Sequence, residues 1–262
     1  MNFPFAFILS SLSGLYTSLW GAFKDSPYEG FKPGTFPRSV YFSAVFFLVL
    51  FALPFYRERL VGLHYFHIFF LMMGMERIIA EIYKGFFRTE DQDKYFVPSR
   101  ITFLGKFVAS DLLRYSVGAV IIIGTFSVLL IDFKISKQIE FLIVSYGAGL
   151  LVSMGGAYKD APFEGFSYLK FQKSPLVLSS TFLLFYYLGE VSLGLLICMN
   201  IGLERFMVEY YKTFIERDMS GKFRPDLKRI QHYLDIREKF HYGALVIIAG
   251  LIALYIYESR SI

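Results

Sequence analysis

The chain has little charge, a single cysteine and a single tryptophan. Asp, Glu, Lys and Arg make up 19% of its 262 residues, whereas soluble domains average about 25%. The lone Cys198 excludes a disulfide framework and a thiolate metal cluster, and we interpret it as a packing residue. The sequence also lacks a phosphate-binding loop, a Gly-x-Ser-x-Gly elbow and a zinc pattern. These absences exclude the common motif-bearing classes of nucleotide-binding enzymes, hydrolases and zinc enzymes.

Apolar residues are abundant and occur in long runs. They make up 55% of the chain, aromatic residues alone make up 19%, and the mean hydropathy is +0.48. Most of the runs approach the roughly 18–20 residues that a membrane-spanning helix needs. We expect an all-α, polytopic integral membrane protein with about eight transmembrane helices, or seven if the short sixth run does not span. The runs are residues 3–23, 39–56, 60–80, 115–133, 141–158, 175–188, 191–208 and 240–257.

The sequence contains an internal repeat. Residues 24–31 read KDSPYEGF and residues 159–166 read KDAPFEGF; we call these two segments the octets. Further landmarks recur in the same order at offsets between 125 and 135, and the changes in offset fall in expected loops. The matched pairs are Phe36-Pro37-Arg38-Ser39 with Phe171-Gln172-Lys173-Ser174, Gly74-Met75-Glu76-Arg77 with Gly202-Leu203-Glu204-Arg205, and Gly118-Ala119 with Gly243-Ala244.

We interpret the repeat as a tandem duplication with halves at 1–134 and 135–262. Each half would hold four spans, so both would have the same orientation about a pseudo-twofold axis along the membrane normal. The first span of each half is rich in Gly and Ser. Small residues let helices approach closely in lipid, and we therefore expect these two spans to pack near the axis.

The basic residues are distributed unevenly along the chain. Most of the 27 Lys and Arg residues fall in the octets and in two long connections, at 84–114 and 212–239. The positive-inside rule then predicts a multi-pass protein of the plasma membrane with these segments in the cytoplasm and both termini outside. The net charge of +5 needs no nucleic acid, because attraction to anionic lipid headgroups accounts for it.

Charged residues recur on one face of two otherwise apolar segments. Arg77, Glu81 and Lys84 share a helix face, and Arg205, Glu209 and Lys212 repeat it. A charge at mid-bilayer costs about 2.5–3.5 kcal/mol on insertion scales. One interpretation is an Arg–Glu pair within each helix that neutralises itself near the interface. The other is a site in which these residues, together with Lys24 and Lys159 from the octets, bind a phosphate.

The octets supply further candidate functional residues. Proline disfavours a continuing helix and glycine permits unusual backbone angles, so we expect a fixed interfacial or re-entrant turn. Its carboxylates are the candidate catalytic acid–base residues. The alternative is a structural plug, in which Lys24 or Asp25 pairs with Arg77 or Glu76 of the same half. The candidate carboxylates are Asp25, Glu29, Asp160 and Glu164.

The histidines do not form a convincing metal site. His64 and His67 are three residues apart, but the matched positions of the second half are Ser192 and Leu195. We therefore expect neither a metal ion nor another cofactor.

The segment Gly202-Leu203-Glu204-Arg205-Phe206-Met207-Val208-Glu209-Tyr210-Tyr211-Lys212 resembles the YGxxRFxxEFxR helix of prolipoprotein diacylglyceryl transferase, and residues 74–84 show the same pattern more faintly. That membrane enzyme transfers a diacylglyceryl group from a phospholipid to a protein cysteine. The resemblance implies that Arg77 and Arg205 contact a lipid phosphate, with Glu81 and Glu209 holding the arginines. The family's GRxGNFxNxE signature is absent from both halves, so a phospholipid-dependent transferase remains one possibility among several.

Three functions therefore stay open. The first is a site for an anionic phospholipid headgroup, catalytic or not. The second is an accessory subunit that docks a membrane protein partner through the octets and basic loops. The third is a transporter of a small ion or solute along a pathway between the halves.

Overall fold

The computed structural model describes residues 1–89, 100–103, 106–217 and 227–260 and is built mainly from helices. Two short β-ribbons, β1–β2 and β3–β4, are antiparallel pairs of two residues each. The elements are, in chain order, α1 (Phe3–Glu29), α2 (Arg38–Ala52), α3 (Pro54–Val61), α4 (Tyr65–Ile82), the π-helical turn η1 (Tyr83–Phe87), β1 (Thr102–Phe103), β2 (Lys106–Phe107), α5 (Asp111–Val128), β3 (Lys134–Ile135), α6 (Gln138–Glu164), α7 (Tyr168–Thr181), α8 (Leu183–Tyr186), β4 (Val191–Ser192), α9 (Leu193–Tyr210), the π-helical turn η2 (Tyr211–Glu216) and α10 (Leu227–Ser259).

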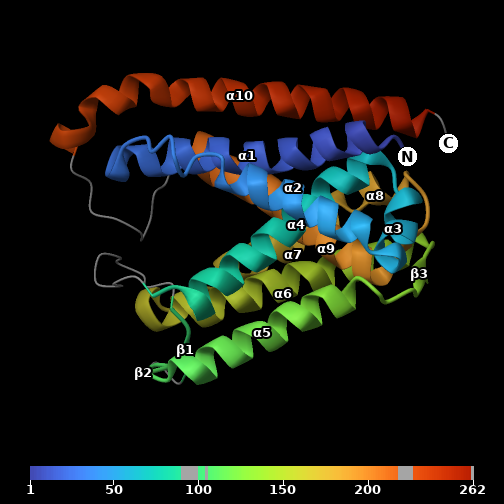
Figure 1. Cartoon of the computed structure of the whole chain (residues 1–262), viewed down its shortest axis with the longest axis horizontal. Coiled ribbons are helices and arrows are strands. Elements are labelled where there is room, and N and C mark those ends of the chain that lie inside the picture. The colour runs from blue at the N-terminus through green and yellow to red at the C-terminus, as the bar shows by residue number, and fades with distance from the viewer. Residues whose placement is uncertain (90–99, 104–105, 218–226, 261–262) are drawn as a thin grey trace.

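The long helices lie side by side along the long axis of the molecule (Figure 1). Both chain termini lie at one end, together with α3, α8 and the β3–β4 ribbon. The C-terminal ends of α1 and α6, which contain the octets, lie at the opposite end, as do β1–β2 and the start of α10. We call these the terminal end and the octet end. The two octets therefore lie at the same end of the molecule.

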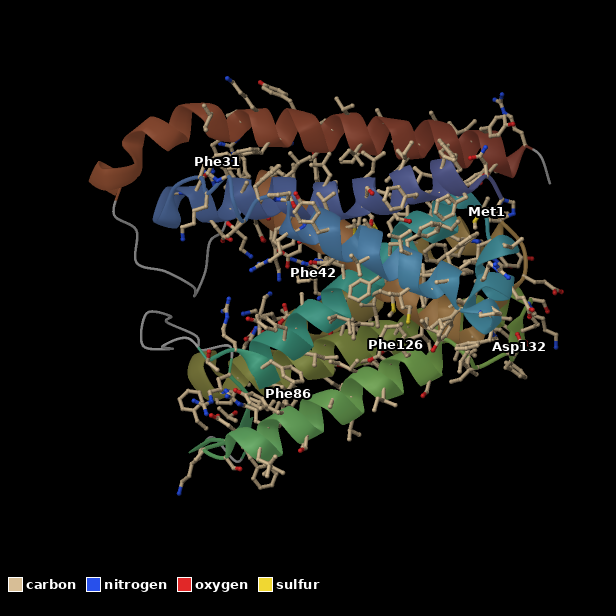
Figure 2. All side chains as sticks on the ribbon, viewed as in Figure 1. Met1, Phe31, Phe42, Phe86, Phe126 and Asp132 are labelled. Atoms are coloured by element: carbon tan, nitrogen blue, oxygen red, sulfur yellow. The ribbon has the colours of Figure 1, made fainter. Side chains whose placement is uncertain are left out.

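Four helices within the described residues are long and apolar enough to cross a membrane: α1, α5, α6 and α10. The pair α2 and α3 would add a fifth span if counted together, but the two helices meet at 105°. Apolar side chains project outward along α5 and α10 (Figure 2), and these include the exposed Val120, Ile123, Val246 and Ile252. These features fit a membrane protein, because such surfaces are stable in lipid and not in water.

Elements at matched positions of the two sequence halves have similar form. α1 and α6 each contain 27 residues, and α4 and α9 each contain 18 residues and pass directly into a π-helical turn. π-Helical turns are rare and are commonly found near functional sites. The expected boundary between the halves, at 134/135, falls within strand β3. This strand pairs with β4, which belongs to the second half.

The octets continue their helices and do not form separate turns. α1 includes Pro27 and α6 includes Pro162, so the expected interfacial turn was wrong for these residues. A proline this close to the C-terminal end of a helix removes only one backbone hydrogen bond there. The helices end at the glycines that follow, with φ of 72° at Gly30 and 79° at Gly165, a conformation that glycine adopts without strain.

The missing hydrogen bond in α1 is replaced by a side chain. Because Pro27 has no N–H, the carbonyl of Phe23 lacks its usual helical donor. Arg237 of α10 donates from Nε to this carbonyl at 2.7 Å, and its guanidinium lies 3.9 Å from the centre of the Phe23 ring. Arg237 therefore fastens the beginning of α10 to the octet end of α1.

The two central helices, α4 and α9, cross with their backbones in contact. A Cβ atom on Gly74 would collide with the carbonyl oxygen of Cys198, and one on Gly202 would collide with the carbonyl oxygen of Phe70. Glycine at both positions allows this close approach. Cys198 is itself buried, as a packing residue would be.

The first spans of the two halves, α1 and α6, also make close helix contacts. The small residues of α1 and α6 serve other contacts: Gly14 lets α1 approach the backbone of α2, and Gly149 lets α6 approach the backbone of α7. The small residues of these two helices therefore do allow close helix packing, as the sequence indicated.

The ends of α4 and α9 at the terminal end are capped in related ways. Glu258 of α10 accepts hydrogen bonds from the N–H groups of Tyr65 at 2.7 Å and Phe66 at 3.0 Å, which open α4. The N–H of Leu193, which opens α9, donates to the backbone carbonyl of Phe133 at 2.7 Å. Helix starts need such acceptors because their first N–H groups have no partner within the helix.

Candidate functional site

The predicted charged residues of α4 and α9 form two clusters beside the central crossing. We name them after their arginines. The Arg205 cluster consists of Trp20, Lys24, Ser39, Glu76, Arg205 and Glu209, and the Arg77 cluster consists of Arg77, Glu81, Lys84, Lys159, Ser174 and Glu204.

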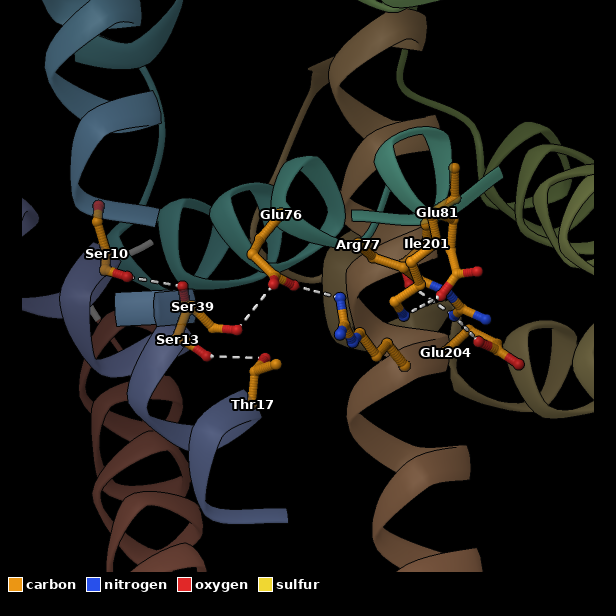
Figure 3. Close-up of polar contacts among 11 residues, drawn as sticks. Ser10, Ser13, Thr17, Ser39, Glu76, Arg77, Glu81, Ile201 and Glu204 are labelled. Atoms are coloured by element: carbon orange, nitrogen blue, oxygen red, sulfur yellow. Dashed lines mark hydrogen bonds and ion pairs between the residues drawn. The ribbon is translucent and has the colours of Figure 1, made fainter. Parts of the chain in front are cut away.

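Each arginine is paired with a glutamate of the other central helix. Arg77 on α4 forms an ion pair with Glu204 on α9, and Arg205 on α9 forms one with Glu76 on α4 (Figure 3). Arg77 also donates to the carbonyl of Ile201 at 3.4 Å. The two bonds run in opposite directions across the crossing, so they join α4 and α9 twice. One of the two interpretations of the sequence was an Arg–Glu pair within each helix, whereas the ion pair of each arginine is formed with the other central helix.

A serine completes each ion pair. Ser39, at the start of α2, donates to Glu76 at 2.8 Å, and Ser174 of α7 donates to Glu204 at 2.6 Å. Both glutamates are almost fully buried. Buried carboxylates need such partners because the cost of removing them from water must be offset by charge pairing and hydrogen bonds.

The lysines of the octets pair with the other two glutamates. Lys24 on α1 lies 3.4 Å from Glu209 on α9, and Lys159 on α6 lies 3.4 Å from Glu81 on α4. Glu81 also accepts from Lys84 at 2.8 Å. The octet lysines therefore contact the opposite half of the sequence, which corrects the expected plug with Lys24 bound to Glu76 or Arg77 of its own half.

The two clusters differ in how much solvent or lipid they meet. The side chain of Arg205 is 7% exposed and that of Arg77 is 21% exposed. The lysines follow the same order, with 14% for Lys24 and 30% for Lys159. The Arg205 cluster is therefore enclosed, and the Arg77 cluster is open.

The tryptophan accounts for part of this difference. Trp20, the single tryptophan of the chain, lies 5.2 Å from the Arg205 guanidinium and 5.7 Å from Lys24 Nζ, measured to its ring centre. It stands one helical turn before Lys24. The matched position before Lys159 is Gly155, and a Cβ added there would meet no described atom within 4 Å. The aromatic cover over one cluster thus has no equivalent over the other.

The predicted catalytic carboxylates are only partly described. Asp25 and Asp160 lie in the last turns of α1 and α6. Glu29 and Glu164 are the last residues of these helices, and their side chains lie outside the described part of the structure. Lys212 lies in η2, at the position that matches Lys84 in η1. The roles predicted for all five residues remain predictions.

Sequence reasoning missed the parts played by Ser39, Ser174 and Trp20. The two serines occupy matched places in the repeat, and that recurrence was the available signal for them. Trp20 had no such signal, because the repeat breaks at its position. Only the packing of α1 against the central helices reveals its contact with Arg205.

The described hydrogen-bonded groups of the Arg77 cluster carry a small excess of positive charge, and the charge of Glu209 on α9 also acts on Arg77. The cluster's described hydrogen-bonded set contains three cations and two carboxylates, because Lys84 and Lys159 share Glu81. The hydrogen bonds of Arg77 to described residues are donated by Nη1, whereas a guanidinium carries five N–H donors. Within the described residues, no group of three or more His, Cys, Asp or Glu could hold a metal ion.

No known protein family, no curated protein and no solved structure matches the chain.

Proposed function

We propose that the chain is a tandem duplication that crosses the membrane about eight times and binds an anionic phospholipid headgroup at its octet end. The similar lengths and endings of α1 and α6, and of α4 and α9, support the duplication. The eight spans would include α4 and α9, whose charges are neutralised by the pairs across their crossing. The octet end would face the cytoplasm, as the distribution of basic residues predicts.

The observation that carries the proposal is the gathering of basic side chains at the octet end. Lys24, Lys84 and Lys159 come from three different elements and converge beside the two arginines. Basic residues at a membrane surface attract anionic lipids, each by about 1 kcal/mol. The resemblance of the α9 segment to the phosphate-contacting helix of prolipoprotein diacylglyceryl transferase agrees with this assignment. A transferase activity would additionally need the octet carboxylates.

The proposal is tested by measuring which lipid stays bound. The protein would be purified gently, exposed to equal amounts of phosphatidylglycerol and phosphatidylcholine, and examined by native mass spectrometry. We expect preferential retention of phosphatidylglycerol, and at least a tenfold loss of that preference when Lys24, Lys84, Lys159 and Lys212 are replaced by Gln. Retention of both lipids to the same degree by the unaltered protein would refute the proposal.

A matched control removes the same charge from the other end. Arg57, Arg59, Lys134 and Lys137 belong to α3 and the β3 region at the terminal end. Their replacement by Gln changes the net charge by the same four units. We expect this variant to retain phosphatidylglycerol like the unaltered protein, because its octet end is intact.

A second candidate function is an accessory subunit of a membrane complex. The observation in its favour is that both arginines are already paired with buried glutamates, as they would be in a purely structural clasp. It predicts a protein partner that co-purifies at a fixed ratio and depends on the octet end, with no preference between lipids.

A further inference from the structure

The two clusters have nearly the same polar residues but different surroundings. Lysine, serine, arginine and two glutamates occur in both, at matched positions of the two halves. A difference in ligand binding between them must therefore come from what covers them and from the extra charge of Lys84 in the Arg77 cluster.

The face of α1 next to Trp20 is covered, whereas the matched positions of α6 are exposed. Along α1, Tyr16, Leu19 and Phe23 are buried. Tyr16 stacks on Phe206 of α9 and donates to its backbone carbonyl at 3.1 Å. These contacts hold α1 against α9 and bring Trp20 over Arg205.

At the matched positions of α6, the side chains lie on the surface. Leu151, Met154 and Tyr158 are all exposed. Gly155 and the adjacent Gly156 have open space at the position of a Cβ atom. No side chain at position 155 therefore covers Lys159 in the way that Trp20 covers Lys24.

We infer that the Arg77 cluster alone is a binding site for a phosphate group, and that Trp20 closes the Arg205 cluster to the same ligand. This inference rests on the proposed function and assigns its ligand to one of two related clusters. The phosphate contacts Arg77 and Lys159. Glu81 already bridges Lys159 and Lys84 with its carboxylate, so these two lysines point toward one anionic group. Arginine is suited to this role because its planar guanidinium matches a phosphate with two parallel donors.

The position of the ligand follows from the same comparison. Trp20 covers Arg205 and Lys24 together, since its ring is within 6 Å of both. On α6 the matched position is Gly155, one helical turn before Lys159, and the space beside it is open. A phosphodiester headgroup enters there from the lipid-facing side of α6, with its acyl chains along the exposed apolar residues of that helix.

The test exchanges the cover between the two clusters. Gly155→Trp adds the tryptophan to the open cluster, and Trp20→Gly removes it from the closed one. Gly156→Trp is the matched control, because it adds the same side chain one residue further, about 100° around α6. Binding of phosphatidylglycerol would be titrated by native mass spectrometry, and inorganic phosphate would be titrated in parallel to distinguish a lipid headgroup from the free anion.

We expect one tightly bound phosphatidylglycerol per chain in the unaltered protein and in Gly156→Trp. Gly155→Trp should weaken this binding at least tenfold, and Trp20→Gly should allow a second lipid to bind. Competition by inorganic phosphate at comparable concentrations would assign the site to the free anion. If the unaltered protein shows no preference for phosphatidylglycerol, the proposed function fails. If it binds this lipid but neither exchange alters the stoichiometry or affinity, only the assignment to the Arg77 cluster is overturned.

Discussion

α1 and α6 have the same length, the same proline near the C-terminal end and the same terminal glycine, yet they have different environments. α1 lies between α10 and the central helices, and its aromatic side chains are buried there. α6 exposes the matched side chains. Two helices of similar sequence can therefore have different surroundings within one fold, because different helices pack against them. The comparison shows that likeness of polar residues does not establish equal access to a ligand.

The largest effect should come from the crossing of α4 and α9, where the glycine of each half lies against the backbone of the other helix. Gly74→Leu and Gly202→Leu each force a side chain into a backbone carbonyl of the facing helix. Because backbone cannot move aside as a flexible side chain can, we expect both variants to lose the folded state. Fluorescence-detected size-exclusion chromatography would measure this, with Gly155→Ala as the control in open space. A normal monodisperse peak from either leucine variant would contradict the close crossing.

The second-largest effect should come from breaking the buried ion pairs, and its size should differ between the two clusters. Glu76→Gln leaves the enclosed Arg205 without its carboxylate, and loss of a buried partner costs about 3–5 kcal/mol. Glu204→Gln should cost less, about 1–3 kcal/mol, because Arg77 is more exposed and can be hydrated. Thermal unfolding in detergent would rank them. Equal shifts in Tm, or the reverse order, would show that the difference in exposure has no energetic consequence.

Removal of the carboxylate cap on α4 should have an intermediate effect. Glu258→Ala leaves two N–H groups at the start of α4 without their acceptor. A hydrogen bond to a charged group contributes about 1.5–3 kcal/mol, so the Tm should fall and the end of α10 should become easier to cleave with protease. Glu258→Gln retains an acceptor oxygen and should recover part of the loss. The second half provides the contrast, because α9 uses the backbone carbonyl of Phe133 and no side chain there can be removed to the same effect.

The smallest effect concerns the proline of α1. Arg237→Met should destabilise the protein by about 1 kcal/mol, because the carbonyl of Phe23 loses its shorter hydrogen bond and keeps only the one from Ser26 Oγ at 3.5 Å. In a Pro27→Ala background the restored N–H would supply a donor, so the same Arg237 substitution should cost measurably less. A double-mutant cycle of thermal unfolding would detect this coupling. If the two substitutions are additive, the hydrogen bond from Arg237 to the Phe23 carbonyl does not compensate for Pro27.

The sequence predicted the helical class, the apolar segments and the matched landmarks because these depend on local composition and order. It did not predict which residues would pair. Arg77 and Glu81 have the spacing of a pair on one helix, but the crossing of α4 and α9 brings Glu204 to Arg77 instead. The relevant signal was Gly74, three residues before the arginine and repeated as Gly202. Its meaning depends on which helix faces which, and a repeat pattern alone does not specify that.

The octets show a second limit of local reasoning. A proline and a glycine within eight residues are typical of a turn, whereas the chain stays helical to the glycine. The compensation for Pro27 comes from Arg237, more than 200 residues away along the chain. A donor supplied from so far away cannot be recognised from the residues around the proline.

The glycine contact between α4 and α9 also carries information about ancestry. Each half contributes the same glycine, the same glutamate and the same arginine. The glutamate of each half pairs with the arginine of the other half, and each glycine lies against the backbone of the facing helix. That reciprocity is the property of an isologous interface between two identical subunits. On the proposed duplication, a single-copy ancestor already had every residue needed to form this contact with a second copy of itself.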